Sequence, residues 1–191
     1  MKRLTIVILI CAAGIAAAEN QPPPEAAKFL ALFDQLRAAQ SGSPRHVEFQ
    51  FTDKEVDEYM RYSLKTTPRP GLESLTIKVF PGNYISTFTV IDFDAVEHWH
   101  PGTVPAVLRP VLNGKKSILV DYRIQAHDSK IGFTVEKAYY QNVHIPAFLV
   151  SKVIGIVAAR QPEKYDTSAP MPIPFGLKAL WTSDHVMHGM N

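Results

Sequence analysis

Two clusters of histidine and acidic residues are the candidates for metal chemistry in this sequence. The first is Glu97-His98-Trp99-His100 and the second is Asp184-His185-Val186-Met187-His188. On a β-strand, His98 and His100 would point to the same face, where both could bind one metal ion. The possible third ligands are Glu97, Asp184 and His127. The alternative is that these histidines lie in loops and cap turns, without any metal.

A pair of carboxylates is the second candidate for chemistry. Asp92 and Asp94 lie two residues apart at the end of an apolar stretch. If both were on a strand, their carboxylates would share one face, an arrangement suited to the acid pair of a glycosidase. The alternative is that they are solvated or cap the turn that follows the strand.

The common enzyme motifs are missing from the sequence. It contains no G-x-S-x-G elbow, no H-E-x-x-H helix and no glycine-rich phosphate loop. Cys11 is the only cysteine, and it lies in a segment that we expect to be removed. We therefore expect a protein without catalytic activity and without a cofactor.

The N-terminal segment has the pattern of a signal peptide. Lys2 and Arg3 precede an uncharged run from Leu4 to Ile15, and small residues follow from Ala16 to Ala18. Cleavage after Ala18 would remove residues 1–18 and leave an exported protein, periplasmic or extracellular. A retained membrane anchor is the alternative, but the run is shorter than the roughly 20 apolar residues that span a bilayer.

The charge balance argues against a nucleic-acid-binding protein. Removal of Lys2 and Arg3 lowers the number of basic residues from 20 to 18, which equals the 18 acidic residues. Nucleic-acid-binding domains usually carry a basic stripe, whereas here lysine and arginine are scattered among acids. After a proline-rich lead-in at residues 19–24, residues 25–191 are predicted to form a single domain large enough to bury a core without disulfides or a metal.

Hydrophobic spacing predicts two helices near the N-terminus, with a brief strand over Val47–Phe51 between them. In the first helix, an apolar face is formed by Phe29, Leu32, Phe33 and Leu36. The second helix is predicted from Asp53 to about Leu64. Its start has the pattern of a capping box, in which Thr52 and Glu55 each bind the backbone N–H of the other.

The rest of the chain repeats a hairpin followed by a helical segment. The first hairpin turns at Pro81-Gly82-Asn83 and returns as a strand from Tyr84 to Phe93, with apolar side chains on both faces. A short apolar segment, Val104–Leu112, precedes a second hairpin that turns at Asp128-Ser129-Lys130. An apolar helix is predicted over Ala147–Ala159, and a last strand pair over Phe175–Trp181 and from His185 onward. This order predicts an α+β fold, a curved antiparallel sheet of hairpins packed around helices.

Three segments resemble the LmeA-like, tubular lipid-binding type of exported bacterial protein. They are the helix opening from Phe51 to Tyr59, the helix entry Ile145-Pro146-Ala147-Phe148-Leu149, and the lead into the last strand, Pro172-Ile173-Pro174-Phe175-Gly176-Leu177. The resemblance implies a half barrel of curved sheet around helices, with a lipid or another hydrophobic molecule in an apolar groove. It implies no chemical step and no catalytic residues.

The expected groove between sheet and helix is lined by residues from the apolar stripes that would face the central helix: Val90, Tyr122, Phe133, Phe148, Val153, Ile154 and Trp181. The alternative is that these side chains fill an ordinary core. The expected partner is a lipid or hydrophobic small molecule, with transient membrane contact.

A second hypothesis is an envelope protein-interaction or assembly factor without a small ligand. In that case the last strand with Trp181, or the proline-rich segments 21–24 and 170–174, would dock on a partner protein.

Overall fold

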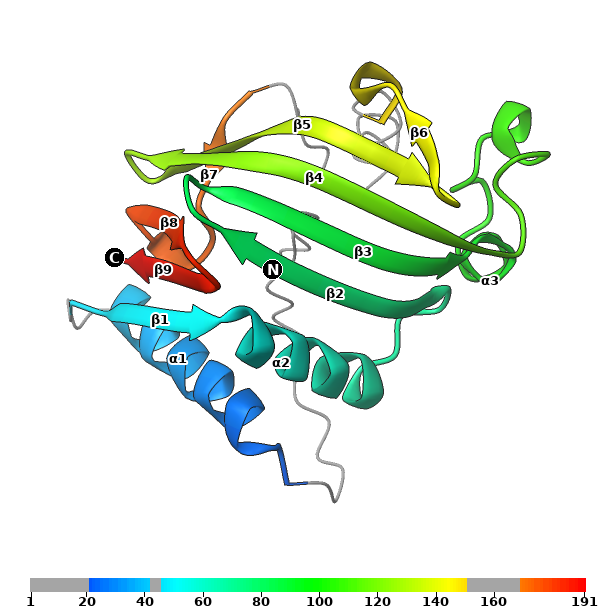
Figure 1. Cartoon of the computed structure of the whole chain (residues 1–191). Helices are drawn as coiled ribbons and strands as arrows, with labels where there is room; N and C mark the ends of the chain where they lie inside the picture. Colours follow the sequence, from blue (N-terminus) through cyan, green and yellow to red (C-terminus); the bar gives the residue numbers. More distant parts are fainter. Residues whose placement is uncertain (1–20, 42–45, 151–168) are drawn as a thin grey trace.

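The computed structural model describes residues 21–41, 46–150 and 169–191, which form an α+β fold with two antiparallel sheets (Figure 1). The small sheet has the strand order β1-β9-β8, and the large sheet has the order β2-β3-β4-β5-β6, with β7 paired to β5. The elements are α1 (Pro24–Gln40), β1 (Glu48–Thr52), α2 (Asp53–Thr66), β2 (Leu72–Phe80), β3 (Tyr84–Asp92), α3 (Phe93–Trp99), η1 (Ala106–Leu108), β4 (Lys115–His127), β5 (Lys130–Tyr140), β6 (Val143–Ile145), β7 (Met171–Pro172), η2 (Pro174–Gly176), β8 (Ala179–Ser183) and β9 (Val186–Met190).

The two N-terminal helices form where the hydrophobic spacing predicts them. The apolar face of α1 is buried, and its members are Phe29, Leu32, Phe33 and Leu36. In α2, the Thr52 hydroxyl accepts from the Glu55 N–H and the Glu55 carboxylate accepts from the Thr52 N–H, so the predicted capping box is confirmed. The two helices are joined by an ion pair between Lys28 and Glu55.

The large sheet is built from the two predicted hairpins. β2 pairs β3 and β4 pairs β5, each pair antiparallel, and β3 pairs β4 to join the hairpins. The predicted α+β class with an antiparallel sheet is therefore confirmed. The sheet remains open, since β2 and β6 end the strand order without pairing to each other.

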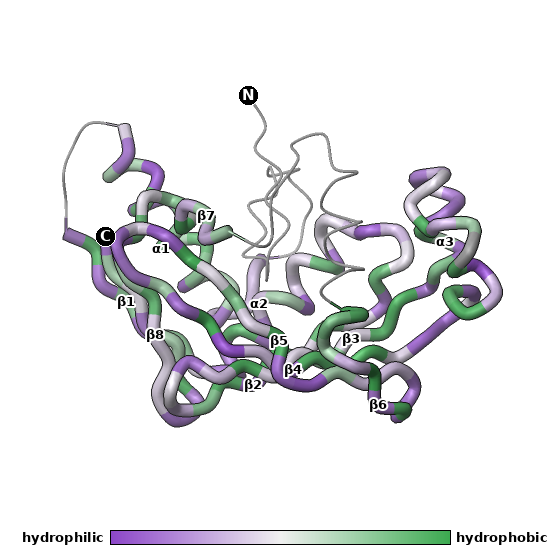
Figure 2. The backbone as a smooth tube through the Cα atoms, turned by 90° about the horizontal axis from the view of Figure 1, so that it is seen from above, coloured by the Kyte–Doolittle hydropathy of each residue, from purple (hydrophilic) through white to green (hydrophobic). Residues whose placement is uncertain are grey.

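The core covers one face of the large sheet. Figure 2 shows α1 and α2 on one side of the sheet, and the buried Ile77, Ile85 and Tyr122 point to that side together with residues of both helices. We call this the inner face. Phe88 on β3 and Leu119 on β4 lie an odd number of residues from Ile85 and Tyr122, so their side chains point to the opposite, outer face.

The edge of β2 is covered by groups from outside the large sheet. The backbone N–H of Ile77 donates to the buried carboxylate of Asp57 on α2, at 2.8 Å. The carbonyl of Val79 accepts from the backbone N–H of His185, in the turn between β8 and β9, at 3.2 Å. These contacts attach α2 and the small sheet to the same edge strand.

A second group of polar contacts joins the small sheet to the β2–β3 turn. Thr182 on β8 donates its N–H to the side chain of Asn83, at 2.9 Å, and its hydroxyl to the carbonyl of Phe80, at 2.6 Å. Asn83 has a φ of 62°, in the left-handed region that asparagine tolerates. The turn is thus held on one side by β8.

Several predicted boundaries were wrong. Residues 93–99 form the helix α3, because Asp92 caps it by accepting from the N–H groups of Asp94 and Ala95 at 3.1 Å. The segment Val104–Leu112 contains only the short helix η1. Strand β8 begins at Ala179, four residues later than predicted, because Phe175 lies in η2 with a positive φ of 61°. Of the predicted helix Ala147–Ala159, residues 147–150 are helical and residues 151–159 lie outside the described residues.

Gly71 fixes the position of α3, which leads to a first prediction. Its φ is 87°, and a Cβ would lie 2.7 Å from the Asp92 carbonyl oxygen and 2.2 Å from a methyl group of Val96. Gly71→Ala should therefore lower the free energy of unfolding by about 1–3 kcal/mol more than Gly102→Ala. Gly102 is the matched control because its φ is 84° and nothing lies within 4 Å of a Cβ there. Equal losses in urea unfolding would contradict the packing of α3 against Gly71.

The carboxylate of Asp57 gives a second prediction. Asp57→Ala would leave the buried N–H of Ile77 without an acceptor, which should cost about 1–3 kcal/mol of unfolding free energy. Asp57→Asn keeps an acceptor oxygen of the same shape and should recover most of that loss. Chemical denaturation of both variants measures the difference, and an asparagine variant as unstable as the alanine variant would contradict the role of Asp57 as acceptor.

The pair formed by Asp53 and His185 predicts a pH dependence of stability. The Asp53 carboxylate lies 2.9 Å from Nδ1 of His185 and 3.5 Å from Nζ of Lys78. Burial alone would raise the pKa of Asp53, but the hydrogen bond from His185 and the charge of Lys78 hold this pKa below its usual value. The hydrogen bond to Asp53, with the charge of Asp184, raises the pKa of His185.

These two pKa shifts determine whether the stability rises or falls with pH. The stabilisation by His185 is complete below its unfolded pKa of 6.5 and is lost as the pH rises through the raised folded pKa. The stabilisation by Asp53 is present above its unfolded pKa of 3.8 and is lost as the pH falls through the lowered folded pKa. In urea unfolding measured from below pH 6.5 upwards, His185→Asn should reduce the loss of unfolding free energy with rising pH. Asparagine is chosen because it tolerates the positive φ of 57° at this position. An unchanged decline in this variant would contradict the assignment.

Candidate hydrophobic binding site

The candidate site begins with a row of apolar side chains across the outer face of the large sheet. Phe88 on β3 pairs with Leu119 on β4, and Leu119 pairs with Tyr139 on β5. Residues that pair directly across antiparallel strands point to the same face, so the three side chains are neighbours. Phe88 is 42% exposed, although it lies in the middle of the sheet.

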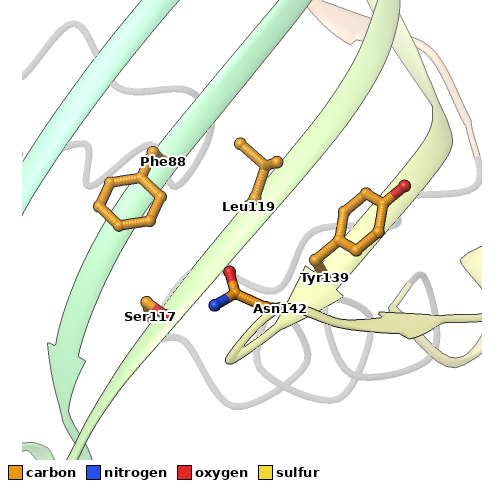
Figure 3. Close-up of a pocket in the computed structure, with 5 residues that line it drawn as sticks. All are labelled: Phe88, Ser117, Leu119, Tyr139 and Asn142. Atoms are coloured by element: carbon orange, nitrogen blue, oxygen red, sulfur yellow. The ribbon is translucent and has the colours of Figure 1, made fainter.

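This row forms the floor of a hollow of about 350 Å³, which is at the small end of the range for ligand pockets. Figure 3 shows that Ser117 and Asn142 lie beside Phe88, Leu119 and Tyr139, on the same side of the sheet. We call these five residues the outer hollow. Its composition, an apolar floor with two polar side chains at one side, is typical of sites that bind small hydrophobic molecules.

The β5–β6 turn positions the polar side of the outer hollow. Gln141 and Asn142 both have positive φ values, of 48° and 66°, which are typical of a tight hairpin turn. The N–H of Gln141 donates to the carbonyl of Ser117 at 2.9 Å and fixes the turn against β4. Within the described part of the chain, the Ser117 hydroxyl and the Asn142 amide make no side-chain hydrogen bond, so both can bind a ligand.

Polar residues bound the outer hollow towards the β2–β3 turn. Arg123 on β4 lies over the ring of Tyr84, 5.7 Å from its centroid, and its Nε lies 2.8 Å from the Glu136 carboxylate. Burial and the hydrogen bond with Asp121 raise the pKa of Tyr84 to about 12, so this hydroxyl stays protonated. On the β6 side, His144 meets the ring of Tyr139 edge-on, with centroids 5.4 Å apart. The apolar patch is therefore confined to one half of the outer face.

The five predicted groove residues that the structure describes lie in different parts of the fold. Tyr122 is 3% exposed in the core, where its hydroxyl lies 3.1 Å from that of Thr87, and Phe133 packs against the same core. Val90 lies on the outer face, in the pairing row that contains Ser117. Phe148 and Trp181 are exposed, and Trp181 stacks on His188. Val153 and Ile154 lie outside the described residues.

Sequence reasoning missed most of the outer hollow. The sequence of β3 contained one signal, because apolar residues occur on both faces of this strand. When one face packs on the core, the apolar residues of the other face, including Phe88, must be exposed to solvent or covered by another element. Leu119, Ser117 and Asn142 gave no separate signal, because their proximity depends on the pairing register of β3, β4 and β5.

The expectation that His98 and His100 share a strand face was wrong. His98 is in the last turn of α3 and His100 caps that helix, so they do not point the same way. The Glu97 carboxylate accepts from the N–H groups of Gly102 and Val104 and binds Arg109, and these contacts lower its pKa. In the described ranges, no three histidine, cysteine or acidic residues are grouped as a metal site would require.

Two other predicted features have structural roles. Asp92 and Asp94 do not share a strand face, since Asp92 caps α3 and Asp94 is in its first turn. Part of the segment from Pro170 to Pro174 is built into the fold, since Met171 and Ile173 are buried and β7 pairs with β5. Strand β8 is held at its edge by the bond from Thr182 to Asn83.

None of the described helices is both long and apolar enough to cross a bilayer. Comparisons of the chain with protein-family models, curated proteins and solved structures gave no match.

Proposed function

We propose that this chain is an exported envelope protein that binds a lipid or another hydrophobic molecule without changing it chemically. The observation that carries the proposal is the outer hollow, where three largely apolar side chains from adjacent strands are accessible to solvent. Beside them lie two polar side chains that make no side-chain hydrogen bond within the described part of the chain. Export is supported by the N-terminal pattern of residues 1–18. The resemblance to the tubular lipid-binding type supports the same class of ligand.

The proposed ligand is amphipathic, with a narrow apolar part. The apolar part would cover Phe88, Leu119 and Tyr139, and a polar head would bind the Ser117 hydroxyl and the Asn142 amide. Such binding depends mainly on removing apolar surface from water, which requires no charged group in the site.

Titration with straight-chain fatty acids of increasing length tests the proposal. Each buried methylene contributes about 0.8 kcal/mol, so the affinity should rise up to about fourfold per methylene until the outer hollow is filled. The side-chain amide resonances of Asn142 report the binding locally in NMR spectra. Leu119→Asp should abolish the binding, because it places a charge on the apolar floor.

The control is Thr134→Asp, an exposed position on the same strand as Tyr139, at the polar half of the outer face. It should leave the affinity unchanged. Binding that survives Leu119→Asp but is lost in Ile154→Asp would instead place the ligand in the groove predicted between sheet and helix. Binding that is unaffected by both variants would contradict both locations.

A further inference from the structure

Two rows of residues on the outer face flank the outer hollow, and each row presents one acid opposite one base. Asp92 pairs with Lys115 across β3 and β4, and Asp121 pairs with Lys137 across β4 and β5. Directly paired residues of antiparallel strands point to the same face, so the two charges of each row are neighbours. Neither pair therefore places a net charge beside the hollow.

Partners outside these pairs engage the same charges further. The Nζ of Lys115 lies 3.0 Å from the carboxylate of Glu73, and Asp121 forms a hydrogen bond with the hydroxyl of Tyr84. When Glu73 is included, the acids that flank the outer hollow outnumber the bases. The local charge thus does not favour an anionic ligand.

The other cations around this face are bound to carboxylates or lie further away. Arg123 is paired with Glu136, and Lys78 is paired with Asp53. Arg69 precedes β2, and β3 separates β2 from β4. In the described part of the chain, these contacts leave no excess of positive charge beside the polar side of the outer hollow.

The polar side of the outer hollow consists of uncharged groups. The Ser117 hydroxyl and the Asn142 amide each contain a donor and an acceptor. His144 contacts the edge of the Tyr139 ring and does not line the hollow. A hydroxyl, amide or ester head group would find matching partners here. An ionised carboxylate only accepts hydrogen bonds, and it would give up part of its hydration without a counter-ion.

The apolar floor is narrow along the strands and longer across them. On β4, Leu119 is flanked on the same face by Ser117 and Asp121, each two residues and so about 7 Å away. Across the sheet, the floor runs from Phe88 through Leu119 to Tyr139, on strands about 4.8 Å apart (Figure 3). One alkyl chain laid across the strands fits this floor, whereas a second chain would lie against a polar row.

Charge and shape together narrow the class of ligand. We infer that the outer hollow binds an uncharged, single-chain amphiphile, such as a fatty alcohol, a fatty amide or a monoacylglycerol, in preference to a fatty acid or a two-chain anionic phospholipid. This inference rests on the proposed function, because it concerns the ligand of the same site. The chain of the ligand lies across β3, β4 and β5, and its head group binds Ser117 and Asn142.

A comparison of 1-decanol with decanoate at pH 8, where carboxylates are ionised, tests the charge preference. The binding of both ligands is followed through the side-chain amide resonances of Asn142 in NMR spectra. We expect decanol to bind about tenfold more tightly or better. Decanoate that binds as tightly as decanol would overturn this inference and leave the proposed function standing. No response of Asn142 to either ligand would contradict the proposed function itself.

A substitution that adds a cation isolates the local effect, because an ionised amphiphile enters any apolar site less readily. Ser117→Lys places a positive charge beside the head group and should reduce the preference for decanol by about tenfold. Thr134→Lys adds the same charge at the polar half of the outer face and should leave the preference unchanged. Circular dichroism checks the fold of both variants. Equal preferences in the two variants would contradict the position of the head group.

Asn142→Asp provides the opposite charge without a change of shape. Asn142 is in an exposed turn with a φ of 66°, which aspartate tolerates. Measured by calorimetry, this variant should bind decanoate several-fold more weakly and keep most of its affinity for decanol. A loss of affinity for decanol as large as that for decanoate would count against the inference.

A second pair of ligands tests the single-chain fit. Monodecanoylglycerol and didecanoylglycerol share an uncharged head group and differ by one chain. The second chain should add less than about tenfold in affinity, because the polar rows leave no apolar floor for it. A gain well above tenfold, with Asn142 still responding, would show that the site takes two chains and would refute this part of the inference.

Discussion

The arrangement of this protein depends on which groups form hydrogen bonds with the backbone at the free edge of β2. An edge strand presents unpaired N–H and carbonyl groups that must be bound by water or by protein. Here Asp57 on α2 binds the N–H of Ile77, and the β8–β9 turn binds the carbonyl of Val79 through His185. These contacts draw α2 and the small sheet to the same strand. The core therefore forms on the inner face, and the outer face has no helix packed on its apolar half in the described part of the chain.

The candidate site follows from that one-sided packing. An antiparallel sheet with one covered face usually alternates apolar and polar residues, and the polar half of the outer face, with Tyr84 and Arg123, obeys this rule. The row of Phe88, Leu119 and Tyr139 departs from it. Exposed apolar surface of this kind lowers solubility unless it binds a ligand or a partner. Ligand binding is therefore the explanation that we favour for the exposure of this row.

Local sequence signals predicted the elements well and their spatial relations poorly. Three signals act within a few residues: the capping box at Thr52, the spacing of Phe29 to Leu36 and the turn at Gly82-Asn83. The structure confirms the element that each of them predicted. The helix α3 was not predicted, because an aspartate at position 92 is equally compatible with the end of a strand and with the N-cap of a helix. The predicted groove assumed that all apolar stripes face one helix, whereas pairing register sends Val90 and Tyr122 to opposite faces.

Native mass spectrometry of the protein purified from the exported fraction, without detergent, tests the central claim most directly. The account predicts a stoichiometric hydrophobic molecule on the unmodified protein, identifiable after organic extraction, and the mass of the bare polypeptide for the Leu119→Asp variant. A bare mass for the unmodified protein, unchanged after incubation with envelope lipids, would contradict the claim that this chain is a carrier of hydrophobic ligands.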